Sequence, residues 1–282
     1  MPLTATPSPP RQHWVRVLRK IASCRSVVLG YHGVAECRRR DDLHFLQVPP
    51  ARFVMQIDLL RAAGFRFVTM AALAQMAAGG TPPPGYAVVT FDDGFRNNYT
   101  TALPILRERG IPATAYVTIG FIDGLSPWIG AGGDGRMMSQ AQLRELAAAG
   151  WELGGHTMTH ADLSLLDYDG CRQEIEQGVA ELERMTSSSV QTFAYPFGRY
   201  GQEALRVVND LGLLAAVTTG SGSWSRFEVT RAMMGAADPL PLVLLKLTDR
   251  YEPLLRSAPA QQLRTLSKQV RERLSQRRRP AG

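Results

Sequence analysis

Short apolar runs alternate with longer segments of helical period along most of this chain. The apolar runs, rich in β-branched residues, lie at 27–31, 67–69, 87–91, 113–119, 151–153, 191–195, 214–218 and 227–230. Between them, apolar residues recur every three or four positions, as on helices with one buried face. These helical segments lie at 51–63, 71–78, 98–109, 139–150, 168–185 and 201–211. Strands that alternate with helices form parallel sheets, so the pattern predicts an α/β fold, a closed or nearly closed βα barrel.

The length of 282 residues suits one barrel domain, because barrels with an outer ring of helices run to about 250 residues. We predict this domain over 26–239, after a basic, flexible leader at 1–25 that starts with a segment rich in Pro, Ser and Thr. Residues 240–282 have helical spacing interrupted by prolines. A helical, basic C-terminal extension is therefore expected to pack beside the barrel or project from it.

The formal charge of +7 comes from the two ends of the chain. Residues 1–40 and 256–282 each hold eight Lys or Arg against one Glu, whereas 41–255 hold 16 basic and 23 acidic residues. Basic ends around an acidic body do not predict a nucleic-acid surface, but they suit peripheral contact with an anionic membrane. No run approaches the roughly 18 apolar residues of a membrane span, and no cleavable signal peptide is recognisable. A cytoplasmic, membrane-peripheral location is expected.

Polar residues that directly follow apolar strands are the first candidates for chemistry, because active sites in parallel βα folds collect at the carboxyl ends of strands. His32 follows the strand at 27–31, and the pair Asp92 and Asp93 follows the strand at 87–91. His156 and His160 follow the strand at 151–153. The other two histidines of the chain, at 13 and 44, lie outside these positions and are expected at the surface.

Asp92 and Asp93 are adjacent, so their side chains leave the backbone in opposite directions and have different roles. Neighbouring carboxylates repel each other unless a cation lies between them, and a metal bound by one would keep the other ionised as a base. The alternative is a helix N-cap, which would explain one Asp of the two.

His156 and His160 are four residues apart, which would place both imidazoles on one face if the segment were helical. Two imidazoles and one carboxylate are a familiar set of ligands for Zn²⁺ or a related divalent ion. Surface helices also produce this spacing by chance. Together with the Asp pair at another strand end, however, it predicts a metal site.

The runs TFDDG (90–94), HTMTH (156–160) and FAYPFG (193–198) resemble the first three motifs of the polysaccharide deacetylase, or NodB-homology, family. The resemblance spans roughly 26–232. It implies a distorted (β/α)7 barrel and metal-dependent hydrolysis of N-acetyl or O-acetyl groups on a carbohydrate substrate. By motif, Asp92 would be the general base, and Asp93, His156 and His160 would bind the metal. Zinc is the expected ion, with cobalt, manganese and nickel as alternatives.

Two positions depart from the family pattern. Ala194 stands where the third motif usually has an Arg, so the partner of Asp92 has to come from elsewhere, and Arg231 is our candidate. The chain also has no histidine after His160, where family members commonly place the general acid. The run YHGV (31–34) is similar to a circularly rearranged branch that includes poly-N-acetylglucosamine deacetylases, in which His32 would be the acid. The alternative is a strand-end histidine bound to a backbone carbonyl.

The remaining candidates concern the oxyanion and the substrate. The backbone N–H of Phe197 follows a proline and is expected to stabilise the oxyanion. Tyr195, Trp128 and Trp224 are expected to contact a sugar, although Trp is also common as plain packing. The same metal and base would serve an amidase or imidase acting on a small non-sugar amide, and an inactive sugar-binding module is a third interpretation.

Overall fold

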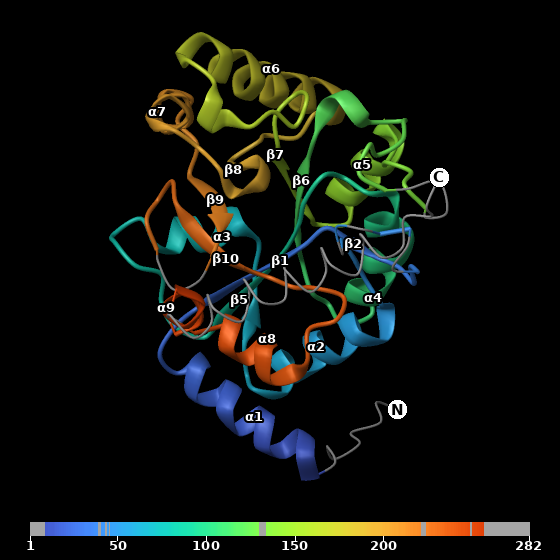
Figure 1. The fold of residues 1–282 in the computed structure, drawn as a ribbon, viewed down its shortest axis with the longest axis vertical. Helices are drawn as coiled ribbons and strands as arrows, with labels where there is room; N and C mark the ends of the chain where they lie inside the picture. The colour runs from blue at the N-terminus through green and yellow to red at the C-terminus, as the bar shows by residue number, and fades with distance from the viewer. Residues whose placement is uncertain are drawn as a thin grey trace, which may run out of the picture.

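A parallel β-barrel forms the centre of the molecule (Figure 1). The computed structural model describes residues 9–256 except 39–40, 43, 45, 130–133, 221–223 and 249. Within these residues, seven parallel strands close the barrel in the order β1-β10-β9-β8-β7-β6-β5, and β5 pairs again with β1. The strands are β1 Val27–Tyr31, β5 Tyr86–Phe91, β6 Thr114–Val117, β7 Glu152–Gly155, β8 Thr192–Ala194, β9 Ala215–Thr219 and β10 Val229–Met233. The predicted (β/α)7 barrel is confirmed.

Three short strands lie outside the closed ring. β4, Arg66–Phe67, pairs with the first residues of β5. β2, Gly33–Val34, and β3, Gln47–Val48, form a separate parallel pair just beyond the end of β1. Neither β2 nor β3 was predicted, because two residues are too few to give a periodic pattern.

Helices surround the strands, with α6 and α7 on one side and α2 and α8 on the other (Figure 1). Three of them begin at the capping residues that their sequences provide. Thr69 caps α3, Ser139 and Gln142 form the predicted capping box of α5, and Asp167 caps α6. The helices between strands are α2 Pro50–Ala62, α3 Met70–Met76, α4 Leu103–Arg107, α5 Gln140–Ala148, α6 Tyr168–Thr186 and α7 Gln202–Asp210.

The first described residues are helical, so the prediction of a flexible leader is wrong for them. Helix α1, Pro9–Ala22, packs on α2 and buries Val15 and Leu18 in the main core. Its opposite face exposes Arg16 and Lys20, and the helix contains no acidic residue. The apolar residues of this amphipathic helix find a partner in α2, which local composition did not reveal.

The chain after β10 forms two helices, α8 Leu240–Lys246 and α9 Tyr251–Arg256. α8 packs against β10 and buries Val243 and Leu244, so the start of the predicted C-terminal extension lies beside the barrel. The rest of the predicted extension, residues 257–282, lies outside the described residues. Within the described part of the chain, no helix combines the length and apolar character that a bilayer span requires.

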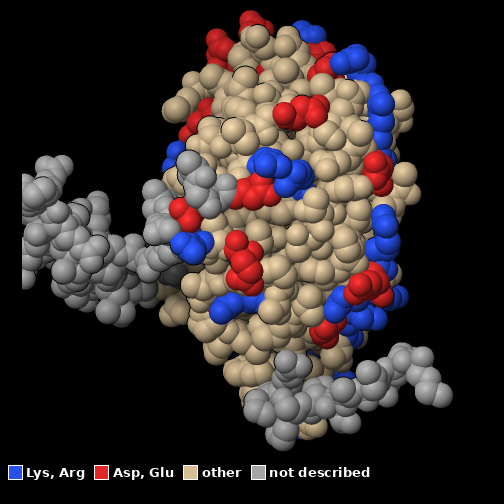
Figure 2. Space-filling model, turned by 90° about the vertical axis from the view of Figure 1, so that its right-hand side faces the viewer, with Lys and Arg blue, Asp and Glu red and all other residues tan. Residues whose placement is uncertain are grey.

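Figure 2 shows one face of the molecule, on which acidic and basic side chains are interspersed.

Candidate active site

A cavity of about 260 Å³ lies at the carboxyl ends of the barrel strands. Its walls contain His32 from the end of β1 and the pair Asp92 and Asp93 from the end of β5. They also contain His156 and His160, which follow β7. The remaining lining residues are His44, Leu46, Trp128, Phe197, Gly198, Thr219 and Met233. The fold thus gathers in one cavity the polar strand-end residues of three separate strands.

Asp93, His156 and His160 form a compact cluster at the base of this cavity. The Nε2 atoms of His156 and His160 each lie 3.4 Å from Oδ1 of Asp93. One ligand atom from each residue lies within 4.8 Å of the other two. The cluster brings together the three residues predicted to bind a metal.

A tight turn, and not a helix, places the two imidazoles together. Thr157 and His160 both have left-handed backbone angles, with φ of 67° and 62°, and the His160 N–H donates to Oγ1 of Thr157 at 2.9 Å. Such angles are unfavourable for a β-branched residue, so the turn is strained. The segment is not helical, so the helical condition under which the spacing was read is not met, but the two imidazoles still lie together.

The donor atoms of the cluster fit a divalent cation. The Nδ1–H of His156 donates to the carbonyl of Ala194 at 2.7 Å, which leaves the Nε2 lone pair directed at Asp93. Oδ1 of Asp93 is buried and has no hydrogen-bond partner among the described residues. Burial raises the pKa of Asp93, but the imidazoles lower it by more when their Nε2 atoms are protonated, a charge that a bound cation would replace. Two imidazole nitrogens and one carboxylate oxygen around one point are a zinc-type donor set.

Asp92 turns away from this cluster and pairs with Arg231. Nη1 and Nη2 of Arg231 contact the two carboxylate oxygens of Asp92 at 2.6 and 2.7 Å, a bidentate ion pair. Arg231 is only 1% exposed and also donates to Oγ1 of Thr90 at 3.0 Å and to the carbonyl of Thr218 at 3.2 Å. Burial raises the pKa of Asp92, but Arg231, together with His156 and His32, outweighs it and holds the pKa below its usual value.

The N-cap interpretation of the Asp pair does not hold among the described residues, because both side-chain oxygens of Asp92 are occupied by Arg231 and Asp93 faces the imidazoles. The ion pair joins residues 139 positions apart. Arg231 lies in β10, whereas the family pattern places an Arg at the position of Ala194 in β8.

His32 and His44 also line the cavity. His32 is half-buried directly after β1, as predicted from its strand-end position. His44 is exposed, as predicted, but it also lines the cavity, which sequence reasoning missed. His44 precedes β3 by three positions, and the pairing of β3 with β2 brings this part of the chain next to the residues that follow β1.

Two aromatic rings flank His160 at the cavity wall. The ring centroid of Trp128 lies 4.4 Å from that of His160, and the centroid of Phe197 lies 4.6 Å from it. Phe197 has a left-handed φ of 59° and its side chain is 54% exposed. The predicted role of its backbone N–H stays a prediction.

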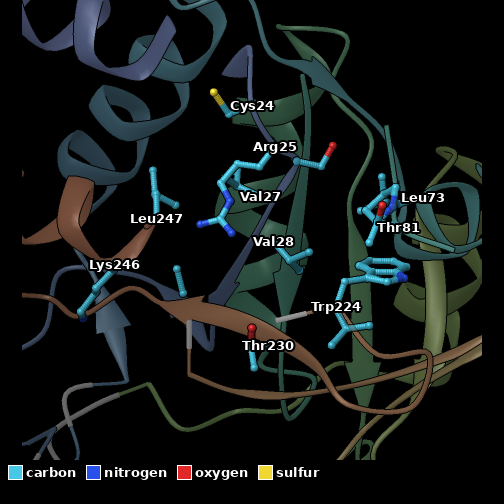
Figure 3. A pocket seen from close by; sticks show the side chains of 14 residues that line it. Cys24, Arg25, Val27, Val28, Leu73, Thr81, Trp224, Thr230, Lys246 and Leu247 are labelled. Carbon is cyan, nitrogen blue, oxygen red and sulfur yellow. The ribbon is translucent and has the colours of Figure 1, made fainter. Parts of the chain in front are cut away.

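Tyr195 and Trp224 do not lie in this cavity, so their predicted contacts with the sugar are corrected. Tyr195 is 1% exposed and packs between Phe193 and Tyr200 outside the barrel. Trp224 lines a second cavity of about 290 Å³ at the other end of the barrel, beside Val27 and Val28 at the start of β1 (Figure 3). Of the three predicted sugar contacts, only Trp128 lines the cavity that holds Asp92 and Asp93.

Comparison with known proteins identifies the family. Residues 79–216 match the family model described as polysaccharide deacetylase. Over 176 residues the chain is 30% identical to the chitooligosaccharide deacetylase of Sinorhizobium fredii, an alignment that covers 59% of this chain and 73% of that protein. The chain belongs to the polysaccharide deacetylase family.

Two further relatives extend well beyond the region that aligns with this chain. The poly-beta-1,6-N-acetyl-D-glucosamine N-deacetylase of Staphylococcus aureus is 26% identical over 175 residues, which cover 59% of each protein. The alignment with the YxkH protein of Bacillus subtilis covers 71% of this chain and 66% of that protein, at 27% identity. The chain therefore spans less than two thirds of the length of these two relatives.

Solved structures of similar proteins share the fold. IcaB from Ammonifex degensii superposes with a TM-score of 0.65 at 26% sequence identity, covering 79% of this chain and 96% of IcaB. The Streptococcus pyogenes deacetylase PplD superposes with a TM-score of 0.69 at 22% identity, covering 80% and 99% of the two chains.

Proposed function

We propose that this protein is a divalent-metal-dependent hydrolase that removes N-acetyl groups from a carbohydrate, with O-acetyl groups as a secondary class. The substrate would carry N-acetylhexosamine units in a polysaccharide, oligosaccharide or glycoconjugate. One observation carries the proposal. The same cavity holds three residues that could bind a metal ion, Asp93, His156 and His160, and a second carboxylate, Asp92, which is paired with Arg231.

Asp93, His156 and His160 would hold the metal, for which zinc is our first candidate. When bound, the ion would supply a Lewis acid that polarises the acyl oxygen and favours the negative charge of the tetrahedral transition state. The ligand residues themselves are already oriented, since the Ala194 carbonyl fixes the tautomer of His156 and Thr157 fixes the backbone of His160.

Asp92 would act as the general base. Arg231 keeps its carboxylate ionised and fixes both oxygens, so the group would accept a proton from the attacking water without first losing one itself. Arg231 would serve as the positioning partner of Asp92, because its guanidinium is buried and is further fixed by Thr90 and Thr218.

His32, which lines the same cavity, would act as the general acid. An amine leaves an acyl centre only after it is protonated, and a histidine can supply that proton near neutral pH. The backbone N–H of Phe197 would donate to the developing oxyanion. Trp128 and the exposed ring of Phe197 would contact the apolar face of the sugar beside His160.

Two comparisons favour a carbohydrate over a small non-sugar amide. The relatives include a chitooligosaccharide deacetylase and a poly-beta-1,6-N-acetyl-D-glucosamine N-deacetylase. The decisive experiment measures acetate release by the zinc-loaded protein from N-acetylglucosamine oligomers and from simple N-alkyl acetamides. We expect release from the oligomers in clear excess. Faster release from the simple amides would favour an amidase, and oligomer binding without release would favour an inactive binding module.

The exposed basic face of α1 supports a further part of the proposal, peripheral contact with an anionic membrane. Arg16 and Lys20 project from a helix without acidic residues, and each such charge near a membrane surface contributes about 1 kcal/mol. Replacing both by Gln should weaken co-sedimentation with phosphatidylserine vesicles and leave acetate release from soluble oligomers unchanged. Equal binding by the variant would remove α1 from the membrane contact.

A further inference from the structure

A buried amide, Asn97, connects the loop that carries the two Asp residues to the segment that carries His32. Asn97 follows Asp92 by five positions and is 5% exposed. Its Oδ1 accepts the backbone N–H of Val34 at 3.0 Å, and its Nδ2 donates to Oε1 of Gln47 at 2.7 Å. One side chain thus bonds to both strands of the β2–β3 pair.

The β2–β3 pair in turn fixes the backbone that follows His32, a residue of the cavity wall. His32 immediately precedes β2, and the N–H of Gly33 donates to the carbonyl of Leu46 at 3.0 Å. On the other side of His32, the carbonyl of Tyr31 accepts the N–H of Asp92 at 2.9 Å. His32 is therefore held at both ends by contacts that lead back to the loop of Asp92.

Gly33 is the position that allows this close packing. A Cβ atom there would lie 2.2 Å from Oε1 of Gln47 and 2.7 Å from Oδ1 of Asn97, both shorter than any normal contact. Only glycine lets the backbone next to His32 approach the two amides.

We propose that Asn97 is a positioning residue that fixes His32 relative to Asp92 and Asp93; this rests on the proposed role of His32 as the acid. A carboxamide suits the task because it accepts one bond and donates another from a single rigid group. The acid and the base act on opposite sides of one acyl centre, so their separation has to be fixed. An error of about 1 Å in such placement can cost about 10²-fold in rate.

Asn98 provides a matched control. It is the same residue type in the next position and is fully buried, yet neither its Oδ1 nor its Nδ2 has a hydrogen-bond partner among the described residues. Asn98→Ala removes a buried amide from the adjacent position and leaves both hydrogen bonds of Asn97 in place. Gln47→Ala is the milder variant, since it removes one of the two bonds of Asn97 and leaves the bond to Val34.

The test compares an N-acetylglucosamine oligomer with 4-nitrophenyl acetate, whose leaving group departs without a proton. We expect Asn97→Ala to lower kcat on the oligomer by about 10- to 10²-fold, with ester turnover within about twofold and bound zinc unchanged. Gln47→Ala should show a smaller change of the same kind, and Asn98→Ala should not alter the ratio of the two rates. A parallel loss on both substrates, or the same ratio in Asn98→Ala, would overturn the proposal.

A readout without turnover separates this proposal from the proposed function. In NMR spectra of protein labelled at histidine, Asn97→Ala should shift or broaden the ring signal of His32 and leave those of His156 and His160 in place. An unchanged His32 signal in a folded variant would refute the positioning role of Asn97, even if the protein is a deacetylase. If the signal changes but the wild type releases no acetate from any sugar, the positioning role of Asn97 stands and the proposed deacetylase function is refuted.

Discussion

Each end of the barrel holds a carboxylate, buried at the carboxyl end and half-buried at the amino end, and the two are stabilised in different ways. At the carboxyl end, Asp92 pairs with Arg231 and its pKa falls below the usual value. At the amino end, Glu152 of β7 receives hydrogen bonds from the hydroxyls of Thr114 and Thr192 and from the N–H of Ala71. Burial raises the pKa of Glu152 and these neutral donors do not fully offset it. A cation partner therefore keeps Asp92 ionised, whereas Glu152 is held by neutral donors alone.

Backbone strain is also concentrated at the carboxyl end. Asp93, Thr157, His160 and Phe197 all have left-handed φ angles, and three of them line the cavity. Strained residues that persist at one site indicate that their side chains have to point in fixed directions there. The strained backbone of the cavity and the ion pair of Asp92 thus lie at the same end of the barrel.

The largest effect is expected from the metal-type cluster. His156→Ala and His160→Ala should each abolish zinc binding and acetate release, because two ligands do not hold the ion tightly. The melting temperature without added metal should change little, since the site lies at the strand ends and not in the core. Zinc content by mass spectrometry checks this, and full zinc occupancy in either variant would contradict the ligand assignment.

Arg231→Met should give the next largest effect. It leaves the Asp92 carboxylate buried without its cation, which in other proteins costs about 3–5 kcal/mol in the free energy of unfolding. Arg199→Met is the control, because Arg199 pairs with Asp162 at the surface with a side chain that is 66% exposed and should cost about 1 kcal/mol or less. Urea unfolding of both variants measures the difference. Equal costs would mean that burial does not distinguish the two ion pairs.

His32→Ala should lower kcat on an N-acetylated oligomer by roughly 10²-fold and affect 4-nitrophenyl acetate much less. The difference arises because only the amine needs a proton in order to leave. Steady-state kinetics on both substrates, with zinc content as the control, checks the assignment. Equal losses on amide and ester would leave His32 as a packed strand-end histidine.

The smallest effect is expected at the amino end of the barrel. Glu152→Gln keeps the shape of the side chain, so acetate release should stay within about twofold and stability should change by about 1–3 kcal/mol. A raised pKa in the folded state means that Glu152 stabilises the fold most at low pH and contributes less as the pH rises above 4.5. The variant lacks this titration, so its stability relative to wild type should increase from pH 4 to pH 7. A relative decrease would contradict the direction of the shift.

The barrel and the catalytic end could be predicted because each strand is a compact apolar run followed directly by its polar residues. The pairing of Arg231 with Asp92 was a hypothesis from elimination, since the sequence does not show that β10 and β5 bring these side chains together. The turn that carries His156 and His160 was missed because no residue in HTMTH favours a left-handed backbone. His44 and Asn97 depend on the two-residue strands β2 and β3, which only the folded chain forms.

Asp92 and Asp93 are adjacent in the sequence, and we propose that Asp92 is the base and Asp93 a metal ligand. The most direct measurement is zinc content and acetate release for Asp92→Asn and Asp93→Asn, prepared side by side with wild type. We expect Asp92→Asn to keep its zinc and lose about 10²- to 10⁴-fold in kcat. Asp93→Asn should lose both zinc and activity. Near-normal turnover in Asp92→Asn, or full zinc in Asp93→Asn, would contradict the account.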